Sequence, residues 1–148
     1  MDGKDAPHLQ AYITRPSSRA MAFVLFGTLF ITFSYFIHVK PGWNVNTRIA
    51  LTYALVEQKT FAIDAYHTKY YMDTGDKAFY KGRFYCDKSP ALSFLAVPIY
   101  AALWSAKMGL GYMADMPHPM WVLTTLYACT VLTVGLCAAL AGVLLWVL

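Results

Sequence analysis

The sequence contains few charged residues. Only 14% of its 148 residues are Asp, Glu, Lys or Arg, and 58% are hydrophobic, whereas about 25% charged residues is usual in a soluble domain. Three windows carry no charge at all: residues 20–39, 89–106 and 116–148. A hydrocarbon core about 30 Å thick needs roughly 20 helical residues, so each window suits at least one membrane crossing. This scarcity of charge excludes an ordinary soluble domain and predicts an integral membrane protein.

Cysteine is also scarce. The chain has three cysteines, and two of them, Cys129 and Cys137, fall inside the third apolar window. The total number of cysteines is odd, and their spacing matches no metal-binding motif. The sequence therefore gives no indication of a disulfide framework, and we expect Cys129 and Cys137 to pack as small apolar side chains.

The pattern of charge predicts an all-α membrane protein with about three transmembrane helices and a structured loop. The expected parts are a polar N-terminal tail at 1–19, transmembrane helices at 20–38, 91–106 and 119–148, and an extramembrane loop at 39–90. The second helix contains Pro98 and is short, so a re-entrant or interfacial helix is the alternative there. The third apolar run reaches Leu148 without an interfacial or basic anchor, which predicts that it continues in a longer protein.

The long loop carries its own patterns of secondary structure. Between positions 46 and 57, apolar residues recur every three or four positions, which predicts an amphipathic helix with Asn44 or Asn46 as its N-cap. Further on, Lys81-Gly82 lies between two aromatic segments and predicts a small hairpin over residues 78–85. These patterns favour a folded loop over a linker.

An acid and a base follow the predicted hairpin, in the segment Tyr85-Cys86-Asp87-Lys88-Ser89-Pro90. A charged-residue pair directly before an apolar run lies at the depth of the lipid headgroups, where Lys88 can reach a phosphate as a compact point charge. The alternative is that Asp87 and Lys88 are the flanking charges that often mark the end of a transmembrane helix.

The order of these elements resembles the N-terminal part of the polyprenyl-phosphate-dependent membrane glycosyltransferases. This superfamily includes protein O-mannosyltransferases and lipid A aminoarabinose transferases. The likeness covers about residues 20–105, and its segments are Asn46-Thr47-Arg48-Ile49-Ala50-Leu51, Lys59-Thr60-Phe61-Ala62-Ile63-Asp64, Tyr85-Cys86-Asp87-Lys88-Ser89-Pro90 and the apolar helix that follows. The resemblance implies transfer of a sugar from a lipid phosphate, and location in the bacterial inner membrane with the N-terminus in the cytoplasm.

The resemblance also implies roles for three residues. Lys88 falls at the lysine that contacts the lipid-linked phosphate, and Asp87 at the acid that orders the site or helps to bind a divalent metal. Arg48 falls at the helix arginine of the family, which assigns it to the same substrate site. Counting Lys and Arg alone would instead put the long loop in the cytoplasm.

The chain departs from the family at the catalytic base. The family usually carries an acid two or three positions before the helix arginine, and here those positions are Val45 and Asn46. An amide cannot take a proton from an acceptor hydroxyl at neutral pH. Either Asp64 or Asp76 is then the catalytic base, or the chain does not catalyse.

Two classes of function therefore remain open. About three helices cannot enclose both a lipid carrier and an acceptor, so the chain is either a segment of a glycosyltransferase or a non-catalytic subunit of a larger membrane complex. The expected partners are membrane lipids, a polyprenyl-phosphate carrier and other membrane subunits, with no nucleic acid. Five phenylalanines recur at three- and four-residue steps on the first apolar helix, where they would face lipid, a pigment or a protein: Phe23, Phe26, Phe30, Phe33 and Phe36.

Overall fold

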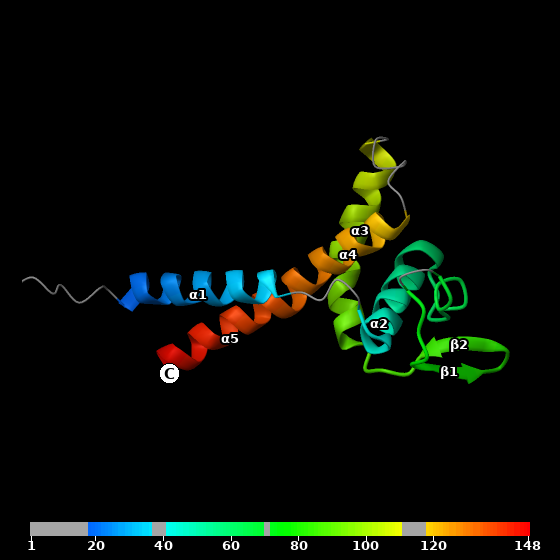
Figure 1. The fold of residues 1–148 in the computed structure, drawn as a ribbon, viewed down its shortest axis with the longest axis horizontal. Helices are drawn as coiled ribbons and strands as arrows, with labels where there is room; N and C mark the ends of the chain where they lie inside the picture. The colour runs from blue at the N-terminus through cyan, green and yellow to red at the C-terminus, as the bar shows by residue number, and fades with distance from the viewer. Residues whose placement is uncertain (1–17, 37–40, 70–71, 111–117) are drawn as a thin grey trace, which may run out of the picture.

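In the computed structural model, the described residues are 18–36, 41–69, 72–110 and 118–148, and most of them are helical (Figure 1). The elements are α1 (Ser18–Tyr35), α2 (Trp43–Tyr53), η2 (Ala54–Gln58), β1 (Lys77–Tyr80), β2 (Arg83–Cys86), α3 (Ala91–Leu110), α4 (His118–Thr130), η3 (Val131–Gly135) and α5 (Leu136–Val147). The segments η2 and η3 are π-helical turns that continue a neighbouring helix. Nearly all of the expected N-terminal tail lies outside the described residues.

Among the described residues, three helices are long and apolar enough to cross a membrane: α1, α3, and the continuous rod formed by α4, η3 and α5. They coincide with the three charge-free windows, which confirms the mainly helical membrane fold expected from the sequence. Helix α1 has no buried residue, and large side chains such as Phe23 and Tyr35 are more than three-quarters exposed. A surface of this kind suits contact with lipid. Helix α3 runs without a break through Pro98.

The three apolar helices do not run in the same direction. Helix α1 lies alongside α5, and the start of α1 is at the same end of this pair as the C-terminus (Figure 1). Gly142 allows the close approach, because a side chain there would overlap Leu29 of α1. Helix α3 packs instead on α2 and α4, and its axis points in a different direction from that of α1 (Figure 1).

The core lies where α2, α3 and α4 meet. The ring of Tyr53 on α2 stacks on Tyr100 of α3 at a centroid distance of 4.1 Å, and the Tyr53 hydroxyl bonds to Thr125 of α4. All three side chains are at most 2% exposed. Helix α2 belongs to the long polar loop but is thus packed firmly against the apolar helices, and this packing positions the residues described below.

The hairpin is confirmed. Strands β1 and β2 pair antiparallel, with Lys77 opposite Cys86 and Tyr80 opposite Arg83. Both turn residues have positive φ, 48° at Lys81 and 80° at Gly82, and this favours the tight hairpin turn that Gly in second place accommodates.

The predicted caps of the loop helix are wrong. Helix α2 begins at Trp43, and its N-cap is Gly42, which makes no side-chain capping bond. Asn44 and Asn46 lie inside the helix, where their side chains make other bonds: Asn44 accepts a hydrogen bond from Arg48, and Asn46 donates one to the Asp73 carbonyl. These partners outcompete the capping geometry that the local pattern favours.

Candidate functional site

The site begins with a short segment that is fastened to the first turn of α2. The Asn46 amide donates to the carbonyl oxygen of Asp73 at 2.8 Å, and the Thr74 hydroxyl donates to the carbonyl oxygen of Trp43 at 2.9 Å. Next to them, Gly75 packs so closely on Trp43 that a Cβ at position 75 would lie 2.7 Å from a ring atom. These contacts fix the backbone that carries Asp76.

This segment brings Asp76 to the beginning of α3. The Asp76 backbone N–H donates to the Thr74 hydroxyl at 3.1 Å. The Asp76 carboxylate lies 3.4 Å from Lys88 Nζ, and Asp87 lies 3.3 Å from the same nitrogen. Although desolvation opposes it, the hydrogen bond to Asp87 and the charges of Asp76 and Asp87 raise the pKa of Lys88 above its ordinary value. Lys88 therefore remains an ammonium ion at any physiological pH.

Arg48 reaches the same place from α2. Its Nε donates to the carbonyl oxygen of Ser89 at 3.5 Å, and its Nη1 donates to the backbone and side-chain oxygens of Asn44. Among the described residues, these hydrogen-bond acceptors are neutral, and Arg48 forms no ion pair. The four residues Arg48, Asp76, Asp87 and Lys88, here called the α3-start cluster, therefore combine two cations with two carboxylates.

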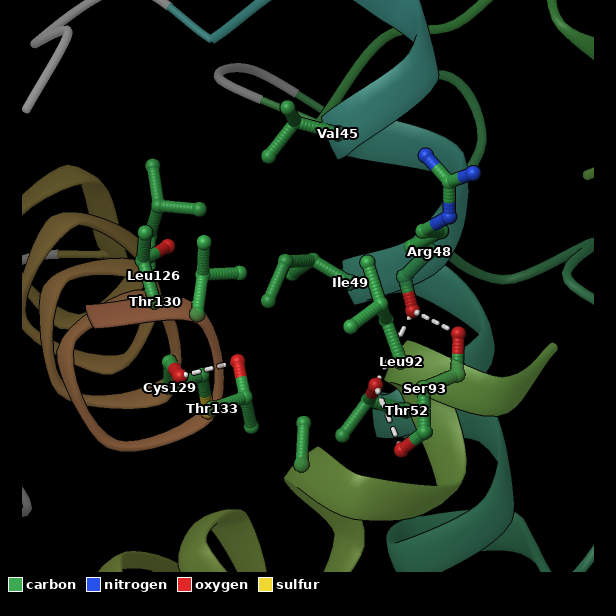
Figure 2. Close-up of a pocket in the computed structure, with 12 residues that line it drawn as sticks. Val45, Arg48, Ile49, Thr52, Leu92, Ser93, Leu126, Cys129, Thr130 and Thr133 are labelled. Atoms are coloured by element: carbon green, nitrogen blue, oxygen red, sulfur yellow. Dashed lines mark hydrogen bonds between the residues drawn. The ribbon is translucent and has the colours of Figure 1, made fainter. Parts of the chain in front are cut away.

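An apolar pocket of about 130 Å³ opens beside Arg48 (Figure 2). Figure 2 shows side chains of α2 and α3 on one side of it and side chains of α4 and η3 on the other. Two of the lining hydroxyl groups donate to backbone: Ser93 to the Arg48 carbonyl at 3.0 Å, and Thr133 to the Cys129 carbonyl at 2.7 Å. Because these polar atoms already have partners, the pocket presents mainly hydrocarbon.

Asp64 lies apart from this cluster. Its carboxylate accepts the backbone N–H of Phe84 at 2.9 Å, while Ile63 donates to the Phe84 carbonyl at 2.8 Å. These two bonds attach the loop to β2. They give the acid at position 64 a structural role that does not depend on catalysis. Of the two candidate bases, only Asp76 forms an ion pair with Lys88 among the described residues.

The α3-start cluster offers a divalent metal at most two carboxylates. Within the part of the chain that the structure describes, no group of three or more His, Cys, Asp or Glu side chains is close enough to hold one. Asp76 and Asp87 are the two carboxylates of the cluster, and the ammonium of Lys88 already contacts both.

Sequence reasoning missed the role of Glu57. Its carboxylate accepts hydrogen bonds from Tyr66, at 2.9 Å, and from Tyr100 of α3. Burial, the hydrogen bond to Glu57 and its negative charge raise the pKa of Tyr66 above its ordinary value, so Tyr66 stays a donor. An acid near the polar end of an amphipathic helix is typical of a solvated position, and only the tyrosines that follow it could have hinted at a buried hydrogen-bond network.

In comparisons with known proteins, no protein-family model matches the chain, and neither a curated protein nor a solved structure matches it significantly. The resemblance to membrane glycosyltransferases therefore rests on the segments quoted from the sequence, and the arguments below rest on the geometry of the site.

Proposed function

We propose that this chain is a membrane module that binds the phosphate of a polyprenyl-phosphate sugar donor, as the first part of a membrane glycosyltransferase. The observation that supports this most is that Arg48, which lines an apolar pocket, donates a hydrogen bond to the carbonyl oxygen of Ser89, the residue that follows Lys88. A guanidinium and an ammonium next to a hydrocarbon-lined space suit an amphiphile with an anionic head.

In this proposal the phosphate competes with the carboxylates for Lys88. Binding of the phosphate between Arg48 and Lys88 draws the ammonium away from Asp76, whose carboxylate becomes able to accept a proton. The acceptor hydroxyl then attacks the anomeric carbon, its proton passes to Asp76, and the bond from sugar to phosphate oxygen breaks. The bond electrons leave with the phosphate, whose charge Arg48 and Lys88 stabilise.

A second candidate is a non-catalytic membrane subunit that keeps the same module. The positions where the resemblance places the catalytic acid support it: Val45 lines the apolar pocket, and Asn46 is engaged with the Asp73 carbonyl. Such a subunit would bind the carrier at the same cluster and transfer no sugar.

Binding of a polyprenyl phosphate to the protein in lipid nanodiscs tests the proposal, with the matching polyprenol, which lacks phosphate, as the control ligand. We expect Lys88→Met to weaken binding about tenfold or more, since a charge-assisted contact to phosphate is lost. Lys88→Arg keeps the charge and should lose less. Lys81→Met removes an equal charge at the exposed hairpin turn and should change nothing. Unaltered binding by Lys88→Met would exclude the phosphate role.

A further inference from the structure

A second cavity, of about 100 Å³, lies beside Tyr53 and shares no lining residue with the pocket of Figure 2. Its lining comes from α2 and η2, the loop after η2, the last turns of α3 and the first turn of α4. The residues are Tyr53, Glu57, Tyr66, Lys69, Trp104, Lys107, His118 and Trp121. None of them was assigned to the carrier site.

The lysines of this cavity rest on aromatic rings. The Lys107 ammonium lies 4.6 Å from the ring centre of Trp121 and 6.0 Å from that of Trp104, and Lys69 lies 5.1 Å from the ring centre of Tyr66. Within the described ranges, neither lysine forms an ion pair with a carboxylate. A ring face stabilises an ammonium only modestly and leaves its charge uncompensated.

One carboxylate, that of Glu57, faces the same cavity, but it is occupied. Each of its oxygens accepts a tyrosine hydroxyl, one from Tyr66 and one from Tyr100. Two lysines and one carboxylate leave one positive charge in excess. The indole N–H of Trp121 is buried and makes no hydrogen bond of normal geometry, and a weaker side-chain hydrogen bond links it to Tyr100.

From this excess of positive charge, we infer that the cavity binds one oxyanion group carrying a single negative charge, of the phosphate or carboxylate type. The volume of the cavity accommodates an oxyanion group of that size. Lys69 and Lys107 would contact the anion, and Trp104 and Trp121 would pack against its substituent. The group could come from an anionic membrane lipid or from a soluble molecule, since both present the same chemistry to the lysines.

The experiment measures how fast each lysine of the whole protein reacts with a water-soluble amine reagent, residue by residue, by mass spectrometry. The ligands are inorganic phosphate in detergent and, in nanodiscs, phosphatidylglycerol against phosphatidylcholine. We expect saturable protection of Lys69 and Lys107, about fivefold or more, and none of Lys81. Lys81 is a matched control because it also lies over a ring, that of Tyr80, at 5.2 Å. Protection by inorganic phosphate identifies a soluble oxyanion, and protection by phosphatidylglycerol alone identifies a lipid headgroup.

Two variants make the test specific. Lys107→Met should abolish the protection of Lys69, because the two lysines share one anion, whereas Lys81→Met should leave it intact. Asp115, which falls outside the described residues, is the nearest acid along the chain to His118. Protection that appears only in Asp115→Asn would show that the chain neutralises the cavity itself, which overturns the inference. Absence of protection by every ligand, or equal protection of Lys81, overturns it as well.

Discussion

Lys88 Nζ lies 3.4 Å from the Asp76 carboxylate, and this ion pair joins the segment before the hairpin to the start of α3. Asp76 precedes the hairpin in the sequence and Lys88 follows it. They meet because the Asp73–Asp76 segment is hydrogen-bonded to α2. Under the proposed function, Asp76 therefore lies next to the lysine that would bind the phosphate, where the transfer would need a proton acceptor. Asp64 is not near Lys88 in this way, because its carboxylate is bonded to the backbone of β2.

The first prediction separates the two candidate bases. In the longest available protein, Asp76→Asn should reduce sugar transfer at least a hundredfold, since general-base catalysis typically contributes 10²–10⁴-fold. Carrier binding should not weaken, because a base acts in the transition state and the phosphate no longer competes with the Asp76 carboxylate for Lys88. Asp64→Asn should mainly lower stability. Asp73→Asn is the control, since Asp73 contributes its backbone carbonyl to the site. Loss of transfer in Asp64→Asn with unchanged folding would reverse the assignment, and no transfer in the wild type would favour the subunit.

The second prediction concerns the close contact that holds Asp76 in place. A Cβ at position 75 would lie 2.7 Å from the Trp43 ring, whereas nothing lies within 4 Å of a Cβ at position 42. Gly75→Ala should therefore destabilise the protein by about 1 kcal/mol, since overpacking costs about 1–3 kcal/mol and the exposed ring can partly move aside. It should also weaken carrier binding, whereas Gly42→Ala, a change at the N-cap of α2, should leave carrier binding unchanged. Denaturant unfolding and the nanodisc binding assay measure the two effects of Gly75→Ala, and equal carrier binding by the two alanine variants would contradict the proposed support.

The third prediction is a dependence of stability on pH. Because burial and Glu57 raise the pKa of Tyr66 in the folded state, the folded protein holds this proton more tightly than the unfolded chain does. Its contribution is complete below the unfolded pKa of about 10 and is lost as the pH rises above that value. Tyr66→Phe should be less stable by about 1.5–3 kcal/mol at pH 7, where it lacks the hydrogen bond to a carboxylate.

Unfolding curves of the wild type and Tyr66→Phe between pH 7 and 11 check this result. The difference between the two proteins should shrink above about pH 10. A difference that stays constant through this range would show that the Tyr66 hydroxyl titrates alike in the folded and unfolded states.

Much of the fold was predictable because local patterns decide it. Charge-free windows define the apolar helices, and Lys81-Gly82 alone selects the hairpin turn. The site was predictable only in part. Lys88 and Asp87 are neighbours in the sequence. The approach of Asp76 to Lys88, however, depends on a long-range hydrogen bond from Asn46 to the Asp73 carbonyl, which no periodic pattern in the sequence predicts. That bond is also the reason why Asn46 does not cap the helix.

The arrangement of the apolar helices leads to a prediction about membrane crossing. The start of α1 packs beside the end of α5: Arg19 and Ala22 lie next to Leu140 and Val143 in one groove. Three crossings would put these two ends on opposite sides of the membrane, whereas two crossings, by α1 and the α4–η3–α5 rod, put them on the same side. Helix α3 then lies in the interface, which agrees with its direction in Figure 1 and with its packing on the polar helix α2.

The fourth prediction follows from this geometry and uses Cys86, which is partly exposed next to Lys88. A membrane-impermeant thiol reagent should label Cys86 in intact cells if the long loop faces outward, as the resemblance implies. A cysteine at position 108, where Met108 is 63% exposed near the end of α3, should be labelled from the same side as Cys86 in a Cys86→Ser background. Labelling of the two positions from opposite sides would show instead that α3 crosses the membrane, and labelling of Cys86 only after lysis would reverse the orientation of the whole chain.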